Sequence, residues 1–333
     1  MDLAILWFAL VVLCWVLFAV LEGFDFGVGM LAGIVGRDEH ERGAAVRTVG
    51  PVWDGNEVWL VAAIGVTFAA FPDWYAALLS GLYLPLVLVL LALAARGVAL
   101  EFRGKVDTAQ WRRRCDVALG VSSLVCAAGF GAVIGVATTG LALGPGGAVA
   151  SGGGAGGALA RSLSPLASWP AAAGALLGVL AALLQGAAFL GLRTTGPVRV
   201  RARRVALATA GVTAVVVAVL AGVAAPVAAP VALLAVVAGV AAALRREATA
   251  FAAASVALLA GVVAAFVAHV PVVLPSTLDP AYSLTIAGAA ASPTALQVIT
   301  IGGVIILPGV IAYQAFSYWV FRRRVASGRE VSA

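Results

Sequence analysis

The stretch VALATAGVTAVVVAVLAGVAAPVAAPVALLAVVAGVAAAL occupies residues 205–244 and contains no charged residue. Arginines flank it on both sides, at Arg204 and Arg245. A single helix of this length would rise about 60 Å, twice the roughly 30 Å hydrocarbon core of a bilayer. Pro226 and Pro230 interrupt its middle, where proline breaks a helix. The stretch therefore predicts two short membrane-spanning helices whose arginine ends lie on the same side.

The rest of the chain has a similar composition. It is 63% hydrophobic and only 11% charged, whereas a soluble domain carries about 25% charged residues. Other long uncharged runs lie at residues 3–21, 74–95, 117–160, 162–192, 248–278 and 280–321. Lipid cannot satisfy open backbone groups, and the period-two alternation of a barrel strand is not visible. We therefore expect an all-α, polytopic transmembrane protein, and not a soluble domain.

The positions of the arginines predict on which side of the membrane each loop lies. The arginines cluster in residues 37–47, 96–114, 193–204, 245–246 and 322–324. The positive-inside rule places all five clusters in the cytoplasm, so an even number of crossings must separate any two. The predicted spans are 3–35, 49–70, 75–95, 116–137, 169–192, 205–225, 230–244, 249–270 and 295–321. We expect about nine helices, with the N-terminus outside and the C-terminus cytoplasmic. Because the basic residues belong to short loops, the net charge of +6 does not indicate nucleic-acid binding.

Residues 1–333 are expected to form one membrane domain of two unlike parts. Residues 1–115 carry helices one to three, and the Ala-rich residues 116–333 carry helices four to nine. Four acids lie in the first two spans: Glu22, Asp25, Asp54 and Glu57. Each pair is spaced i, i+3, so each pair shares one helical face. A carboxylate within the membrane costs several kcal/mol unless it is neutralised, paired or hydrated.

Two interpretations of these acids stay open. Arg96 or Arg103 could neutralise them in a buried ion-pair network. Alternatively, the acids could take up and release protons. Counting outward from the loop places Asp25 roughly opposite Trp59, at the depth of Glu57. Small residues would let the two backbones approach closely, and Asn56 would add a neutral donor and acceptor. These predicted hairpin glycines are Gly23, Gly27, Gly29 and Gly55.

Residues that bind haem iron or metals are scarce. The histidines are His40, in a predicted loop, and His269, near a helix end. The cysteines are read as small hydrophobic residues, without disulfide or metal spacing: Cys14, Cys115 and Cys126. Buried haem iron usually needs His, Met or Cys at helix depth. We therefore expect no cofactor or metal bound by this chain alone.

Several motifs carry a resemblance to a known family. EGFDFGVG at residues 22–29 and PVWDGNEVWL at residues 51–60 resemble the two signatures of subunit II of the cytochrome bd quinol oxidases. The same likeness continues in Phe71-Pro72, Tyr75-Ala76, Arg96-Gly97-Val98-Ala99, Glu101-Phe102-Arg103 and Trp111-Arg112. The similarity is strong over residues 15–115 and weaker beyond, where Gln185-Gly186-Ala187 is one of the matching segments.

The resemblance implies a fold and a partner. The fold would be two four-helix bundles plus one peripheral helix. The partner, in a heterodimer, would be subunit I, which carries two b-type haems, one d-type haem and the quinol site. The complex would sit in the bacterial inner membrane, oxidise quinol, reduce dioxygen to water and contribute to the proton motive force. Small accessory subunits, bound lipid or quinone, and the identity of the quinol stay open.

The resemblance also implies residue roles. Asp54 would line a proton route, and Trp59 would line an oxygen route or serve in packing. Apart from the resemblance, the depth of Glu57, Asp25 and Glu22 in their spans makes them candidates for the same proton route, and the hairpin geometry assigns Asn56, Gly55 and Gly29 to its support. The family often has Asp at the position of Glu22 and Gln at that of Glu57, so Glu57 adds a charge. No catalytic residue, cofactor ligand or metal ligand is expected in this chain.

Two other functions compete with this one. A secondary transporter would show inverted repeats and broken helices in both halves, whereas the polar residues here occupy one half. A purely structural partner subunit is the other alternative. It predicts that removing Asp54 changes assembly but not the turnover of assembled complex.

Overall fold

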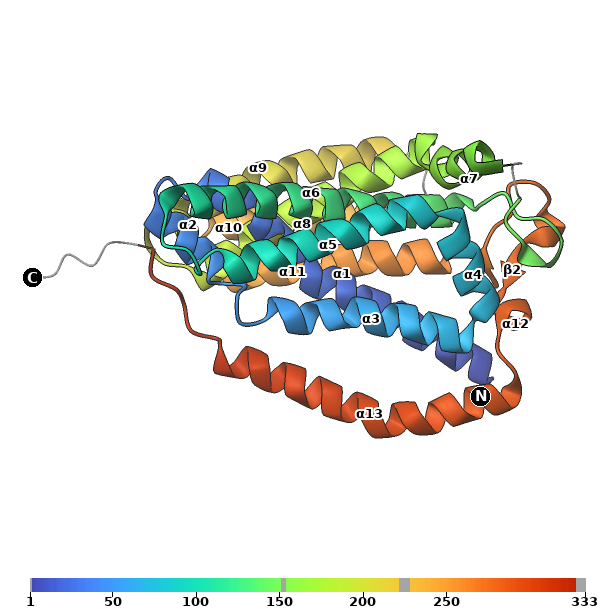
Figure 1. Cartoon of the computed structure of the whole chain (residues 1–333). Coiled ribbons are helices and arrows are strands. Elements are labelled where there is room, and N and C mark those ends of the chain that lie inside the picture. The colour runs from blue at the N-terminus through green and yellow to red at the C-terminus, as the bar shows by residue number, and fades with distance from the viewer. Residues whose placement is uncertain (1, 151–153, 222–227, 328–333) are drawn as a thin grey trace, which may run out of the picture.

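The computed structural model describes residues 2–150, 154–221 and 228–327. Long helices run side by side between two ends of the molecule (Figure 1). The helices are α1 (Leu3–Val35), α2 (Glu39–Val46), α3 (Trp53–Ala70), α4 (Pro72–Gly81), α5 (Tyr83–Phe102), α6 (Ala109–Thr139), α7 (Gly154–Leu163), α8 (Trp169–Arg193), α9 (Gly196–Ala221), α10 (Ala228–Ala243), α11 (Glu247–Val267), α12 (Ile286–Ala289) and α13 (Pro293–Val320). The described residues also form two short strands, β1 (Val272–Leu274) and β2 (Leu284–Thr285).

Among the described residues, seven helices are long and apolar enough to cross a membrane: α1, α5, α6, α8, α9, α11 and α13. The shorter α10 and the more polar α3 occupy the other two predicted spans of the described chain. The all-α, polytopic membrane fold is therefore confirmed. Pro226, at the predicted break between the sixth and seventh spans, lies outside the described residues.

The predicted span at 75–95 is wrong in its bounds. The chain forms α4 and α5 there instead, and α5 continues to Phe102. Arg96 therefore lies inside a helix and is fully buried, with 0% of its surface exposed. The charge does not end the helix, because buried acids on α1 face it, as described below.

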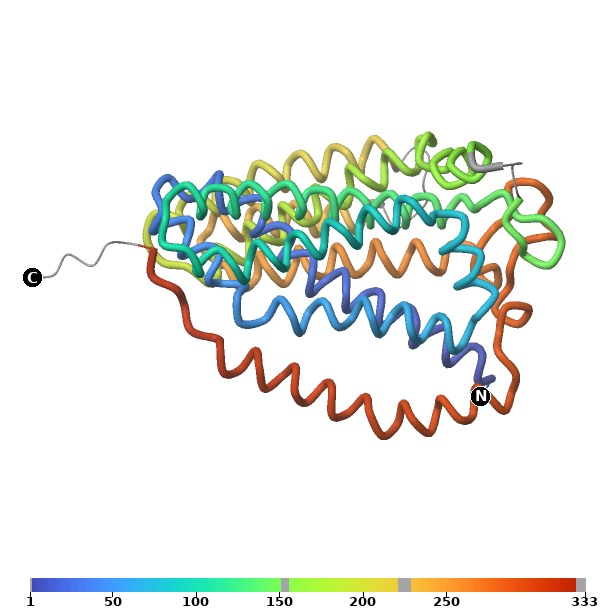
Figure 2. Tube along the Cα trace, viewed as in Figure 1, coloured from blue at the N-terminus to red at the C-terminus, as the bar shows by residue number. Residues whose placement is uncertain are grey.

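The spanning helices form two bundles with one helix outside them. The first bundle is α1, α3, α5 and α6, and the second is α8, α9, α10 and α11. Helix α8 joins the two by packing against α1 and α6 as well as α9 and α11. Helix α13 runs along the edge, next to α3 and α1, and the trace in Figure 2 shows it set apart from the rest. This is the arrangement that the resemblance implied.

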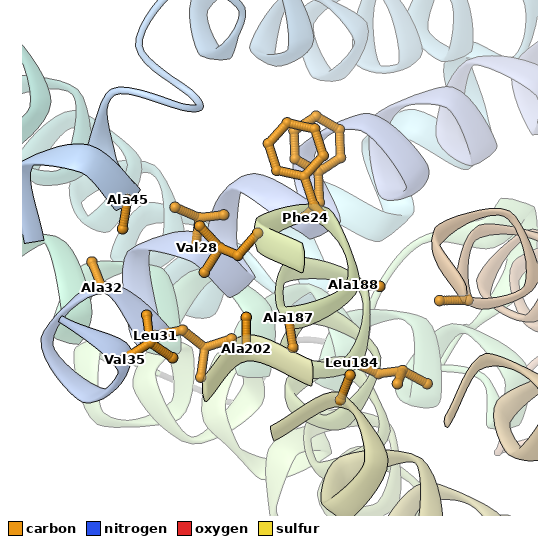
Figure 3. Packing of buried hydrophobic residues seen from close by; sticks show 14 of the residues in the cluster. Phe24, Val28, Leu31, Ala32, Val35, Ala45, Leu184, Ala187, Ala188 and Ala202 are labelled. Carbon is orange, nitrogen blue, oxygen red and sulfur yellow. The ribbon is translucent and has the colours of Figure 1, made fainter. Parts of the chain in front are cut away.

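The central contact of the fold lies between α1 and α8. Figure 3 shows Phe24, Val28 and Leu31 of α1 in one buried cluster with Leu184 and Ala187 of α8. Gly27 lies within the same stretch of α1, against the backbone of α8 at Ala182 and Gly186. A Cβ atom at Gly27 would overlap the Ala182 carbonyl, so only glycine fits. Small residues allow such close helix approach in membrane proteins.

The arginine clusters meet at one end of the molecule, beside α2. Arg201 of α9 reaches Glu41 of α2 at 2.5 Å. Arg103 reaches Asp116 at 2.6 Å, Arg203 pairs with Glu247, and Arg193 donates to the Phe321 carbonyl. Arg103 also pairs with Glu39 of α2 at 2.9 Å, so these contacts connect all five clusters at one end of the molecule. The crossings between the clusters are therefore even in number, as the parity argument requires.

Glu41 is the acid that ties α2 to α9. Its Oε2 accepts a hydrogen bond from the Arg37 backbone N–H at 2.7 Å and pairs with Arg201. Burial raises the pKa of Glu41, but the hydrogen bonds from Arg201 and Arg37 outweigh it, so the pKa lies below its ordinary value. The carboxylate therefore stays charged at neutral pH and holds this loop in place.

The opposite end carries the two strands, α7 and α12. Strand β1 pairs antiparallel with β2, and Val272 lies opposite Thr285. The loop after α6 joins them: the Leu141 N–H donates to the Pro275 carbonyl at 3.1 Å, and the Thr277 N–H donates to the Leu141 carbonyl at 2.9 Å. Two loops that are distant in the sequence thus close this end of the helices together.

The orientation of the protein in the membrane stays a prediction that reporter fusions can test. Fusions after Arg47, Arg114, Arg204 and Arg246 should give a cytoplasmic signal, because positively charged loops are retained there. A fusion at Asp279, in the strand-bearing end, should give an external signal and serves as the matched control. A cytoplasmic signal at Asp279 would contradict the predicted orientation.

Candidate functional site

The four acids of the first two spans lie on α1 and α3, but the structure does not treat them alike. Glu22 and Asp25, on α1, are buried with 0% and 1% of their surface exposed. Arg96 of α5 faces both of them. Its Nη1 lies 2.5 Å from Glu22 Oε1, and its Nη2 lies 3.9 Å from Asp25 Oδ2. The expected neutralisation by a buried arginine therefore holds for these two acids.

Aromatic rings surround the rest of the Arg96 side chain. Its guanidinium carbon lies 5.2 Å from the ring centre of Phe26 and 5.9 Å from that of Trp53. Such contacts favour a cation that has lost its water. One guanidinium nevertheless faces two carboxyl groups. Among the described residues, Glu22 Oε2 and Asp25 Oδ1 have no hydrogen-bond partner. The cluster therefore keeps acceptor sites for a proton or a water molecule.

Arg103, the other proposed counter-charge, is not part of this cluster. It pairs with Asp116 at 2.6 Å and with Glu39 at 2.9 Å, both at the arginine-rich end. The reason is its position: it follows the last turn of α5, nearly two helical turns beyond Arg96. The prediction that either arginine could serve is thus decided in favour of Arg96.

Asn56 joins three helices at the level of the acids. Its Nδ2 donates to Asp25 Oδ2 at 2.7 Å and to the Leu21 carbonyl at 3.2 Å, which links α3 to α1. Its Oδ1 accepts from Gln314 Nε2 at 2.9 Å and from the Tyr318 hydroxyl at 2.7 Å, which links α3 to α13. Asn56 thus bonds both helices of the hairpin and the peripheral helix α13.

Sequence reasoning missed Gln314 and Tyr318. The available signal was their spacing, since two polar side chains at i, i+4 share one face of the otherwise apolar last helix. Gln185 was noticed only as a faint part of the resemblance. It is fully buried, and its Nε2 donates to the Val20 carbonyl at 2.8 Å and to Ser255 Oγ at 3.0 Å. It therefore ties α8 to α1 and α11.

Asp54 and Glu57 form a separate pair on α3. Asp54 is exposed and Glu57 is half-buried, and the side chain of neither makes an ion pair or hydrogen bond with another described residue. Arg96 interacts with Glu57 only through its electrostatic field. Helix α3 begins at Trp53, later than the predicted span, so Asp54 lies in its first turn. Asp54 is thus closer to the arginine-rich end than the sequence suggested.

The predicted packing of the hairpin through glycines is wrong. The space around Gly29 is taken by Ser123 of α6, and that around Gly55 by Gln314 of α13. Gly23 and Gly27 face Gln185 and the backbone of α8. Helix α1 is surrounded by neighbours, and its glycines face α6 and α8 and not α3. The spacing of glycines in a sequence does not tell which neighbour they face.

Trp59 lies in the interior next to the hairpin. It is buried in an apolar cluster with Phe18 of α1 and Leu60 and Ala63 of α3. Its Nε1 has no hydrogen-bond partner among the described residues. Asp25, which was expected opposite Trp59, bonds Asn56 instead, about one helical turn away. The surroundings of Trp59 suit packing and an apolar route equally.

The two histidines lie far from this cluster. His40 is exposed in α2 at the arginine-rich end, and His269 is exposed just after α11 at the other end. The described part of the chain contains no group of three or more His, Cys, Asp or Glu side chains arranged to hold a metal ion. The described interior therefore offers no histidine to a haem.

The chain is similar to several known proteins over most of its length. The chain matches the family described as cytochrome bd terminal oxidase subunit II over residues 3–321. It is 37% identical over 335 residues to cytochrome bd ubiquinol oxidase subunit 2 of Bacillus subtilis strain 168, covering 96% of each chain. It is 42% identical over 123 residues to cytochrome bd-I ubiquinol oxidase subunit 2 of Escherichia coli K12, covering 37% of this chain and 32% of that one.

A solved structure shows the same fold. A chain of the bd oxidase from Geobacillus thermodenitrificans superposes with a TM-score of 0.69, at 19% identity, over 96% of this chain and 99% of the other. The match to the family covers all of the spanning helices, which favours an oxidase subunit over a secondary transporter. The chain belongs to the subunit II family of the cytochrome bd terminal oxidases.

Proposed function

We propose that this chain is the subunit of a membrane quinol oxidase that carries no haem of its own, docks against a haem-bearing subunit I and feeds protons toward it through Asp54. The family implies a complex that oxidises a quinol in the bacterial cell membrane and contains haem. Reduction of dioxygen to water consumes one proton for each electron, so the reacting site needs a proton supply.

The haems are assigned to subunit I, two of b type and one of d type. The support is the position of the histidines here, since His40 and His269 are exposed at opposite ends of the helices. Haem iron needs an axial side chain held in a dry interior. The histidines of this chain do not fit that requirement, so no step of the reaction is placed on them.

The observation that carries the proton role is the open position of Asp54. It lies on the outer face of α3 together with Val58, Val61 and Phe68, all of them exposed. Val61 has 71% of its surface exposed. A face that is apolar but begins with a carboxylate is unsuited to lipid alone, because lipid does not solvate charge. We assign this face to the contact with subunit I, with Asp54 at its entrance.

Deeper acids continue the proposed route. Glu57 follows Asp54 by one helical turn, about 4.5 Å further along α3. Beyond it lie Asp25 and Glu22, whose two unpartnered oxygens can accept a proton or a water molecule. Trp59 is proposed to line an apolar path for dioxygen beside this route, or to pack it. The order Asp54, Glu57, Asp25, Glu22 thus leads from the arginine-rich end toward the interior.

Replacing Asp54 with asparagine tests the proposal. Asn keeps the shape and hydrogen-bonding capacity but cannot exchange a carboxyl proton. A relay acid contributes about 100-fold when no detour exists. Because Asp54 is exposed and water offers a detour, we expect a smaller loss of quinol-driven oxygen consumption per haem, with normal haem content. Turnover is measured per haem, so that lost assembly is not counted as slow catalysis.

Asp73→Asn is the matched control, since Asp73 is also exposed and in the first turn of a helix, but at the opposite end of the hairpin. It should leave turnover per haem unchanged. Normal turnover per haem in Asp54→Asn would remove Asp54 from the route. Loss of the assembled complex with normal turnover of the remainder would favour the purely structural role.

A further inference from the structure

Arg161 stands apart from the arginine clusters. Every lysine and arginine of the sequence except Arg161 and Arg329 falls within the five clusters. Arg161 lies in α7, at the end of the molecule that carries β1 and β2 (Figure 1). The acids Asp2, Asp73 and Asp279 belong to the same end, yet none of them pairs with it. A cation in this position, away from the retained basic loops, needs its own explanation.

Helix α7 is held firmly, so the position of Arg161 is defined. The neighbouring Ser162 has only 3% of its surface exposed. Its Oγ accepts a hydrogen bond from the Leu84 backbone N–H at 2.8 Å, in the first turn of α5. Helix α7 also contacts α4. These contacts fix α7 across the ends of two helices.

A cavity of about 270 Å³ opens beside Arg161. Its walls are largely apolar or small, with Leu141 and Val149 on one side and Gly157, Ser164 and Pro165 around the arginine. The described residues of the lining include no acid. Arg161 Nε is buried and has no hydrogen-bond partner among the described residues, and the guanidinium makes no ion pair with them. Burying such a group without an acceptor is unfavourable, so the cavity is suited to an anion.

The surroundings of the cavity identify the kind of anion. Leu159 and Leu163 of α7 are exposed, as is Trp169 at the start of α8. Exposed leucines on a short surface helix, with a tryptophan and a basic residue nearby, are typical of the boundary between headgroups and acyl chains. Arginine is also the residue that best matches phosphate, through paired N–H donors.

We propose that the cavity binds the phosphate of one membrane phospholipid, with its acyl chain lying over Leu159 and Leu163. This site is distinct from the acids of α1 and α3, and it does not depend on the proton role of Asp54. The guanidinium of Arg161 donates hydrogen bonds to the phosphate oxygens, which satisfies the buried Nε. The lipid fastens α7, and through Ser162 the start of α5, to the bilayer surface.

The test compares complexes purified with all their subunits in a mild detergent. Native mass spectrometry counts the phospholipid that each complex retains through detergent washing. Arg161→Gln should lose one retained phospholipid, since a charge-assisted contact of this kind changes affinity by about tenfold or more. Arg204→Gln is the matched control, because it removes an exposed arginine of α9 at the opposite end. It should retain the same lipid as the parent complex.

Three results would overturn the proposal. Equal retention in Arg161→Gln and in the parent would show that Arg161 holds no lipid. Release of the partner subunit from Arg161→Gln would show that a partner's acid occupies the cavity. Occupation by inorganic phosphate alone, with no retention of phosphatidylglycerol added back from vesicles, would show a site for free anions. If Arg161→Gln does not assemble for other reasons, the test uses parent complex from which the lipid has been removed. Saturable binding of added phosphatidylglycerol to this complex supports the site. Absence of such binding rejects it.

Discussion

Replacing Arg96 with glutamine is expected to prevent accumulation of folded protein. The change leaves Glu22 and Asp25 buried without the only cation that contacts them among the described residues. Removing one partner from a buried ion pair costs about 3–5 kcal/mol, because the remaining charge has no compensation. A protein is stable by only about 5–15 kcal/mol in total, so this loss is a large share. The measurement is the yield of monodisperse protein in detergent, together with its thermal unfolding temperature.

The loss should depend on charge and not on volume. Arg96→Lys keeps the cation, so it should retain part of the stability while losing the planar contacts with Phe26 and Trp53. Combining Arg96→Gln with Glu22→Gln and Asp25→Asn removes all three charges and should recover much of the yield, because a neutral buried cluster carries no unpaired charge. If the triple variant were no better than Arg96→Gln, the ion pairs would not be what stabilises this interior.

Replacing Gly27 with alanine is expected to lower the stability strongly, by separating α1 from α8. The added Cβ would overlap the Ala182 carbonyl and crowd the Cα of Gly186. Both are backbone atoms, so no side chain can rotate away to make room. Inserting carbon into a packed interior typically costs 1–3 kcal/mol, and about the upper end is expected here. Thermal unfolding of the purified protein in one detergent provides the measurement.

Gly33→Ala is the matched control within the same helix. A Cβ at Gly33 meets nothing within 4 Å, and the residue is exposed. This change should be neutral or slightly stabilising, because alanine favours a helix over glycine by about 0.5–1 kcal/mol. Equal unfolding temperatures for the two variants would show that the backbones of α1 and α8 are further apart at Gly27 than in this structure.

Much of the architecture could be predicted because hydrophobicity and charge are local properties. The bounds of α1, Leu3–Val35, agree with the predicted span. Residues 205–244, which were predicted to form two helices, belong to the separate helices α9 and α10. The failure at residues 75–95 has a physical cause. Arg96 was taken as a helix end because an isolated charge avoids the membrane interior, but buried acids on another helix neutralise it.

The site could be predicted only in part. The four acids were found because carboxyl groups are rare in apolar helices, and Arg96 was a named partner. The roles of Gln314 and Tyr318 were not found, since they lie more than 250 residues from Asn56 in the sequence. The hairpin glycines were misassigned for a similar reason: α1 has neighbours on several sides, and helical spacing describes only one helix at a time.

The sequence by itself determined the membrane class, most of the spans, the even parity between arginine clusters and the concentration of acids in α1 and α3. These features follow from hydrophobicity, helix length and charge, which depend only on the sequence of each segment. Only the tertiary structure decided which acids are neutralised and which stay open. That choice depends on how each helix is rotated and shifted against its neighbours. Packing of side chains from distant segments sets that rotation, and it gives Arg96 to Glu22 and Asp25 while Asp54 stays exposed on the outer face of α3.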